Sequence, residues 1–264
     1  MKVSVIITTY NSPAYLKKVL YGLLCQKKTP DEIIVADDGS GDDTAEMIQH
    51  LSAMFTSPLL HVWQENKGFR AAKIRNKAIA RSSGDYIILL DGDCIVNHHF
   101  VSDHLSLAEE GCFIQGKRVL VNKSAVASFT YKDANSFAGL WKMVLNGELS
   151  NVHHLIYFPF PLSVKNRRLK GIKSCNMSFF KKDVLAVNGF NENFVGWGNE
   201  DSDLACRLFH YGLRKKTPPF MAICFHLWHP TNITAADVNK QLLQKTIISE
   251  DYFCENGLIK KDQP

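Results

Sequence analysis

Short apolar runs alternate with amphipathic segments through the first hundred positions. The runs at residues 3–8, 32–36, 60–64 and 86–90 are rich in Val, Ile and Leu and have the length of buried strands. Between them, a segment starting at Pro13 and the segments 43–51 and 70–80 carry apolar residues at helical spacing. This alternation predicts an α/β fold, with a mostly parallel central sheet flanked by helices and joined by right-handed crossovers.

The pattern is less regular after residue 100. Residues 175–180 and 222–227 have the pattern of short strands, and residues 201–211 that of a helix ended by Gly212. Residues 235–252 predict a terminal helix. Residues 128–175 mix aromatic, glycine and basic residues, and their pattern predicts neither a helix nor a strand. With 264 residues and no repeat or linker, we expect a single domain.

The composition narrows the class of protein. Hydrophobic residues make up 45% and charged residues 22% of the chain, as in packed globular proteins. No apolar run reaches the 18 or so residues of a membrane-spanning helix, and residues 1–10 do not resemble a signal peptide. The net charge of +5 is too small to favour nucleic acid as a partner. Seven scattered cysteines without a CxxC pair are typical of a reducing compartment, so we expect a cytoplasmic protein.

Two acidic clusters follow predicted strands, at Asp37-Asp38-Gly39-Ser40 and at Asp91-Gly92-Asp93. Open parallel sheets bind ligands beyond the carboxyl ends of their strands, which is where both clusters are expected. Carboxylates there are suited to Mg²⁺ or Mn²⁺ bridged to substrate phosphates, or to ribose hydroxyls. The alternatives are an acidic turn at the second cluster and a helix-capping turn at the first. The glycine-rich signatures of dinucleotide and P-loop sites are absent from the sequence.

Two later motifs add further candidate chemistry. Trp197 offers a flat face for a sugar, and Glu200 and Asp201 beside it offer carboxylates for general-base catalysis. The alternative is the acidic first turn of the following helix. His226 and His229 follow or end the last predicted strand, where imidazoles serve as metal ligands or as structural hydrogen-bonding groups.

The order of these motifs resembles that of family 2 glycosyltransferases of the GT-A fold. The later motifs resemble the galactosyltransferase-type half found in chondroitin polymerases and bacterial surface-polysaccharide enzymes. The resemblance covers roughly residues 1–230 and rests on TTYN at 8–11, DDGS at 37–40, NKGFRAAKIRN at 66–76, DGD at 91–93, WGNED at 197–201 and HLWHP at 226–230.

The resemblance implies a role for each matching residue. Nucleoside binding falls to Thr8, Tyr10 and Asp37 or Asp38, and the diphosphate to Arg70, Lys73 or Arg75. The resemblance further implies that Asp91 contacts the ribose or a metal-bound water, and that Trp197 lies beside the sugar. The resemblance implies that Asp93 and a histidine hold the metal, Mn²⁺ or Mg²⁺, with Asp91 beside them. Of the two histidines, His229 matches the family's ligand better than His226. Asp201 matches the catalytic base, and Glu200 contacts the donor or acceptor sugar.

The implied activity is a metal-dependent inverting transfer of Gal, GalNAc, Glc or GlcNAc from a UDP-sugar to a hydroxyl of a glycan or lipid-linked glycan. Lipopolysaccharide, capsule or another surface polysaccharide is the implied product. Retaining relatives carry Asn at the position of Asp201. The Asp in this sequence therefore favours inversion. Within one domain we expect residues 1–100 to bind the nucleotide sugar, residues 101–232 to bind the acceptor and catalyse, and residues 233–264 to form a helical extension. The alternatives are a sugar-nucleotide nucleotidyltransferase and a non-catalytic sugar-nucleotide binder.

One basic stretch is not explained by these roles. Residues 165–182 contain seven Lys or Arg and no Asp or Glu. Such a stretch is suited to anionic lipids at the inner face of a membrane or to a phosphorylated acceptor. The alternative is a solvated basic loop.

Overall fold

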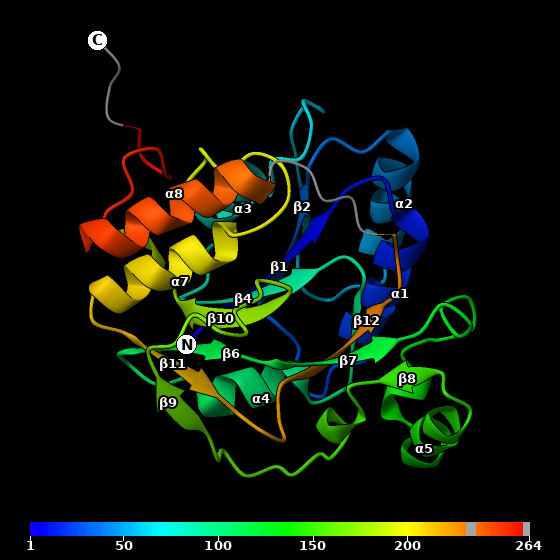
Figure 1. Cartoon of the computed structure of the whole chain (residues 1–264). Helices are drawn as coiled ribbons and strands as arrows, with labels where there is room; N and C mark the ends of the chain where they lie inside the picture. The colour runs from blue at the N-terminus through cyan, green and yellow to red at the C-terminus, as the bar shows by residue number, and fades with distance from the viewer. Residues whose placement is uncertain (231–235, 261–264) are drawn as a thin grey trace.

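The computed structural model describes residues 1–230 and 236–260. The first part of the chain alternates strands and helices as the sequence predicted (Figure 1). Its elements are β1 (Val3–Thr9), α1 (Pro13–Leu24), β2 (Glu32–Asp37), α2 (Asp42–Ser52), β3 (Leu59–Trp63), α3 (Ala71–Arg81) and β4 (Tyr86–Asp91).

The second part holds shorter elements, several of which the sequence pattern did not reveal. They are β5 (Cys94–Val96), α4 (Phe100–Leu107), β6 (Cys112–Gln115), β7 (Lys117–Val121), α5 (Phe137–Leu145), β8 (Leu149–Ser150), β9 (Val164–Asn166), β10 (Asn176–Phe180), α6 (Lys181–Ala186), α7 (Glu200–His210), β11 (Arg214–Thr217), β12 (Ile223–Leu227) and α8 (Ala236–Ser249). The helix predicted for 235–252 corresponds to α8. Residue 235 and the expected boundary at 232/233 lie outside the described residues.

Two sheets organise these strands. The larger has the order β3-β2-β1-β4-β10-β6-β11-β9, and the smaller has the order β5-β12-β7-β8. The predicted parallel arrangement holds from β3 to β4, whereas β10 pairs antiparallel with β4 and β6, so the whole sheet is mixed. In register, Thr9 lies opposite Asp37 and Thr8 opposite Asp91. Both acidic clusters therefore flank the carboxyl end of β1.

Helices cover both faces of the larger sheet. Alternation along β1 directs Val5 and Ile7 towards α1 and α2, and Ile6 towards α3 and α7. Strands β1, β2 and β4 are consequently buried on both faces, which explains their continuous apolar sequences. None of the helices in the described part of the chain is long and apolar enough to cross a membrane.

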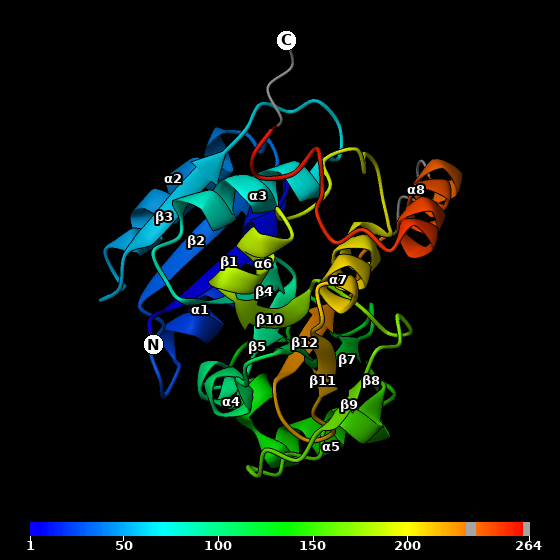
Figure 2. The same ribbon diagram turned by 90° about the vertical axis from the view of Figure 1, so that its left-hand side faces the viewer.

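Helix α8 packs along α7 in both views (Figures 1 and 2), and a buried carboxylate links the two helices. Asp203 on α7 accepts hydrogen bonds from Arg207 Nε at 2.9 Å and from Thr246 Oγ1 of α8 at 2.6 Å. Because Asp203 is fully buried and already occupied, it belongs to the structure of α7 and not to a binding site.

We expect Asp203→Ala to lower the free energy of unfolding by about 3–5 kcal/mol, because the substitution leaves the buried Arg207 guanidinium without its carboxylate. Urea denaturation followed by circular dichroism measures this change. Glu46→Ala, at an exposed position of α2, is the control and should change the stability by less than about 0.5 kcal/mol. Equal losses in the two variants would contradict a linking role for Asp203.

Candidate active site

A buried guanidinium lies at the centre of the site. Arg75 on α3 donates from Nε to Thr8 Oγ1 at 3.0 Å, from Nη2 to Asp91 at 3.2 Å and from Nη1 to Glu200 at 2.9 Å. Burial opposes the charged form of Arg75, but Asp91 and Glu200 outweigh it and hold its pKa above the usual value. The ends of β1 and β4 and the first residue of α7 therefore meet at one cation.

The first acidic cluster is bound by groups of the protein itself. Asp37 accepts from the N–H of Ser40 at 2.8 Å and lies 2.9 Å from His61 Nε2. Burial acts to raise the pKa of Asp37, but the hydrogen bonds from His61 and Ser40 outweigh it, and the pKa lies below its usual value. Asp38 accepts from Gln64 Nε2 and from the N–H of Arg70, both at 2.6 Å, while burial raises its pKa.

The turn between β2 and α2 is narrow. Gly39 has φ +100°, and a Cβ at this position would lie 2.6 Å from the backbone of Asn66. The helix-capping interpretation of this motif fits only in part, because Gly41, not Ser40, is the N-cap of α2. Asp37 instead closes the turn before the helix.

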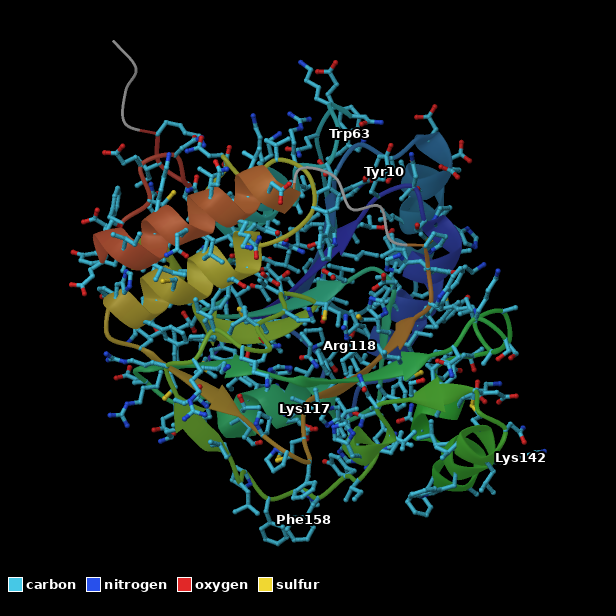
Figure 3. All side chains as sticks on the ribbon, viewed as in Figure 1. Tyr10, Trp63, Lys117, Arg118, Lys142 and Phe158 are labelled. Atoms are coloured by element: carbon cyan, nitrogen blue, oxygen red, sulfur yellow. The ribbon has the colours of Figure 1, made fainter. Side chains whose placement is uncertain are left out.

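Two aromatic side chains stand exposed beside this turn (Figure 3). The hydroxyl of Tyr10 accepts from Asn66 Nδ2 at 2.9 Å, and Trp63 Nε1 donates to the carbonyl of Ser40 at 3.0 Å. The sequence pattern did not single out Trp63. The signal that was available is its position as the last residue of a strand next to the DDGS turn.

The second acidic cluster divides between two environments. Asp91 pairs with Arg75, and burial raises its pKa against the attraction of that guanidinium. Asp93 lies 3.0 Å from His229 Nε2 and 3.6 Å from His226 Nε2. Burial acts to raise the pKa of Asp93, but the hydrogen bond with His229 and the nearby charge of His226 hold it below its usual value.

The group of Asp93, His226 and His229 has the chemistry of a divalent-cation site. One potential ligand atom from each lies within 4.8 Å of the others. A carboxylate with two imidazoles suits Mn²⁺ and similar ions. The hydrogen bond with Asp93 raises the pKa of His229, and a cation would take the place of the shared proton. Both histidines face Asp93, because β12 pairs His226 with Cys94 of β5. Asp91 is not part of this group.

The loop before α7 presents Trp197. Gly196, Gly198 and Asn199 all have positive φ, so the chain turns sharply on both sides of Trp197, which is 43% exposed. The loop is held by a hydrogen bond from the N–H of Gly196 to the carbonyl of Phe69, and by Asn239 of α8, which donates to the Trp197 carbonyl at 3.3 Å.

The two carboxylates at the start of α7 differ in their partners. Glu200 is bound by Arg75, whereas Asp201 accepts from the N–H groups of Ser174 at 3.3 Å and Ser202 at 2.7 Å. Burial, together with the charge of Glu200, raises the pKa of Asp201 to about 6, although Arg75 opposes the shift. Both interpretations of this motif fit the structure in part. The acids form the first turn of α7, and Asp201 also lies beside the network of Arg75.

Two residues predicted near the diphosphate lie at the start of α3. The backbone of Arg70 binds Asp38, and its Nη2 donates to the carbonyl of Glu65. Its Nε is buried and has no hydrogen-bond partner in the described part of the chain. Lys73 is half-buried in the first turn of α3, and the described residues show no ion pair for it.

Two family models match the chain. The model for glycosyl transferase family 2 matches residues 4–186, and the model for the N-terminal domain of galactosyltransferase matches residues 160–230. A hyaluronan synthase of Pasteurella multocida is 29% identical over 81% of the chain, and a chondroitin synthase of Escherichia coli is 25% identical over 79%. The chain spans 23% and 32% of the lengths of these two relatives.

Solved structures share the fold. The structure of S. aureus TarS 1-349 in complex with UDP-GlcNAc has a TM-score of 0.70 at 18% identity, over 95% of this chain and 66% of that one. The mannosyltransferase PcManGT from Pyrobaculum calidifontis, in complex with GDP-Man and Mn²⁺, has a TM-score of 0.61 at 16% identity, over 94% and 63%. The GT-A fold predicted from the sequence is confirmed.

We expect Asp93→Ala to weaken Mn²⁺ binding by at least tenfold, because it removes the one carboxylate of the three-residue group. His226→Ala and His229→Ala should each do the same, because both imidazoles face Asp93. Titration of Mn²⁺ followed by electron paramagnetic resonance measures the affinity. His50→Ala, an exposed histidine on α2, is the control. If one of the two histidine variants binds Mn²⁺ normally, that histidine is not a ligand.

Proposed function

The chain belongs to glycosyl transferase family 2, and we propose that it transfers a hexose from a UDP-sugar to a hydroxyl of a glycan acceptor with inversion. The observation that carries the proposal is that Asp91, Glu200 and the end of β1 all bind the Arg75 guanidinium. Asp201 lies beside this network, and Asp93 follows Asp91 by two residues. The four candidate donors are the UDP forms of Gal, GalNAc, Glc and GlcNAc.

In the proposed donor site, the nucleoside lies over the ends of β1 and β2. Tyr10 and Trp63 offer exposed aromatic faces there. The carboxylates of the Asp37–Asp38 turn are buried and hydrogen-bonded within the protein, so their role is to fix the backbone beside these two rings. The UDP-GlcNAc complex of TarS, a protein with the same fold, supports a UDP-sugar as donor. Arg70, Lys73 and Arg75 supply positive charge from α3 for the diphosphate, and Trp197 lies beside the transferred sugar.

The metal proposed for this reaction is Mn²⁺ or Mg²⁺, held by Asp93, His226 and His229. When bound, it supplies the positive charge that makes UDP a better leaving group. The Mn²⁺ in the PcManGT complex supports a divalent cation in this fold. Asp91, bound to Arg75, is available for ribose or for metal-bound water.

Asp201 is proposed as the general base that takes the proton of the acceptor hydroxyl. With a pKa of about 6 it is ionised at neutral pH, yet it is more basic than an ordinary aspartate. The N–H groups of Ser174 and Ser202 fix its carboxylate. Glu200 is held by Arg75 and so remains a binding group for sugar hydroxyls. A single base acting on the acceptor hydroxyl is consistent with inversion.

The acceptor is proposed to be a glycan or lipid-linked glycan of a surface polysaccharide such as lipopolysaccharide or capsule. We place the nucleotide-sugar half at residues 1–100 and the acceptor half at residues 101–232. A screen of the four UDP-sugars for release of free hexose, with and without Mn²⁺, tests the activity without a known acceptor. Absence of hydrolysis for every donor would contradict the proposal.

Peripheral contact with an anionic membrane is part of this proposal. Five apolar side chains at alternate positions, four in the loop before β9 and one at the start of β9, are between 45% and 64% exposed, namely Ile156, Phe158, Phe160, Leu162 and Val164. The loop and α5 lie at the same edge of the molecule, where Figure 3 labels Phe158 and Lys142. Exposed cations stand on α5, at Lys142, and directly after β9, at Arg167. Exposed apolar residues together with cations are suited to anionic lipid.

We expect Asp201→Asn to lower the rate of UDP-sugar hydrolysis by roughly 10²- to 10⁴-fold, the usual contribution of a general base. Binding of UDP should persist, because Asn keeps the shape of the side chain and the first turn of α7. Hydrolysis under saturating donor and a melting curve measure the two effects. Near-normal turnover with normal stability would reject Asp201 as the base and direct attention to Glu200.

The same assignment gives a pH dependence. The pKa of Asp201 is raised to about 6, so its ionised fraction falls as the pH drops through that value. We expect kcat/KM to be level above pH 7 and to fall about tenfold per pH unit below pH 6. In Asp201→Asn this inflection should disappear, whereas an unchanged profile would assign the inflection to another group.

We expect Phe158→Ser combined with Phe160→Ser to weaken binding to vesicles containing phosphatidylglycerol by roughly tenfold or more, because two apolar side chains no longer enter the lipid. Vesicle co-sedimentation measures the partition. Ile248→Ser, which removes a 71% exposed apolar residue from α8, is the matched control. If the unmodified chain binds neutral vesicles as well as anionic ones, the contact has no electrostatic part. If the double substitution leaves vesicle binding unchanged, the loop before β9 does not contact the membrane.

A further inference from the structure

A basic cavity of about 500 Å³ lies beside the candidate base. Its wall is built by β6, β7, β9 and β11 and by the segment 168–176. Within the described residues it includes no Asp or Glu, and its cationic side chains are Lys117, Arg118, Arg168, Lys170, Lys173 and Lys215. Lys117 and Arg118 line the cavity from the start of β7. Figure 3 labels both residues. The volume is in the usual range for small-molecule sites.

Among the described residues, none of these cations forms an ion pair with a carboxylate, although Asp201 lies near Lys173 and Asp91 near Arg118. None of the ion pairs among the described residues includes any of the six. The buried Lys215 ammonium donates instead to the carbonyl oxygens of Arg168 at 2.6 Å and Lys170 at 2.7 Å, which fixes the loop that carries those two cations. Burial lowers the pKa of Lys117, with no acid nearby to offset the shift. An anion in the cavity would relieve this uncompensated charge.

The cavity wall is continuous with the catalytic groups. The segment that contributes Lys173 and Cys175 to the wall also contributes the Ser174 N–H that binds Asp201 at 3.3 Å. Asn176, another wall residue, is paired with Leu90 at the end of β4, next to Asp91. None of the residues of the Asp37–Asp38 turn or of the Asp93 group lines the cavity within the described residues. The cavity therefore lies beside Asp201 and shares no lining residue with the proposed donor site among the described residues.

We infer that this cavity holds an anionic group of the acceptor sugar, a phosphate ester or a carboxylate, next to the hydroxyl that Asp201 deprotonates. The inference rests on the proposed function, because it takes Asp201 as the base. It narrows the acceptor from any glycan to a negatively charged one. Lysine and arginine together suit either anion, since a phosphate or carboxylate accepts several charged hydrogen bonds at once.

Calorimetric titration tests the binding. The full chain is first saturated with UDP and Mg²⁺ to fill the donor site, and is then titrated with glucose 6-phosphate, glucuronate and glucose. We expect at least one anionic sugar to bind tenfold or more tighter than glucose, and its affinity to fall with salt. The stronger of the two anions identifies the group as phosphate or carboxylate. Equal affinity for all three sugars would overturn the inference.

Variants then place the binding in the cavity. Lys117→Gln combined with Arg168→Gln should weaken binding of the anionic sugar roughly ten- to a hundredfold, because two charged hydrogen bonds are lost. Arg214→Gln, which removes an exposed cation from β11 outside the cavity, is the matched control and should leave binding unchanged. Melting curves verify that both variants fold. Unchanged binding in the folded double variant would overturn the inference.

A last measurement separates the inference from the proposed function. If the anionic sugar lies next to Asp201, it should exclude water there and lower the release of free hexose from the UDP-sugar, whereas glucose at the same concentration should not. Binding without any effect on hexose release would overturn the acceptor role. Absence of hydrolysis in the unmodified chain would instead reject the proposed function, and the titrations would still report on the cavity.

Discussion

The buried guanidinium of Arg75 is the contact on which the rest of the active site depends. Its five N–H groups point in fixed directions, and three segments supply the oxygens that accept from it: the end of β1, the end of β4 and the start of α7. A buried cation needs such partners, because its desolvation is otherwise uncompensated. The burial of Arg75 therefore determines how α7 approaches the sheet.

Arg75 also separates the roles of neighbouring carboxylates. Asp91 and Glu200 are occupied by the guanidinium, whereas Asp93 and Asp201 are not hydrogen-bonded to it. Asp93 consequently faces the two histidines, and Asp201 keeps a raised pKa. Acids that are close in the sequence thus have different environments. In the proposed mechanism, one member of each pair positions other groups while the other binds metal or accepts a proton.

Opposite charges gather on the two sides of Asp201. The strand ends carry the acidic clusters that suit a cation and a nucleotide, and the wall built by β7, β9, β11 and the segment 168–176 carries six basic residues. Ser174 connects the two regions, because its N–H binds Asp201 while its neighbours line the basic cavity. In the proposed reaction, the carboxylate of Asp93 would help to hold the metal ion of the donor site, and the basic cavity would hold the acceptor.

The sequence by itself determined the alternating first hundred residues and the acidic strand ends. Strands buried on both faces need continuous apolar runs, and each helix between them needs an apolar stripe, so this information is local. The order of the motifs also identified the family. The strands β5, β6 and β7 and the mixed character of the sheet were not evident, because strands of three to five residues have no reliable period.

Only the tertiary structure decided which residues meet. Register places Thr8 opposite Asp91, and β12 places His226 beside Asp93, although more than 130 residues lie between them in the sequence. The structure also divided the basic stretch 165–182: Lys165 and Lys182 form ion pairs with Glu109 and Glu110. Arg168, Lys170 and Lys173 line the cavity and form no ion pair with any residue that the structure describes. The physical reason is that pairing of charges depends on distance in space, which a single sequence specifies only through the completed fold.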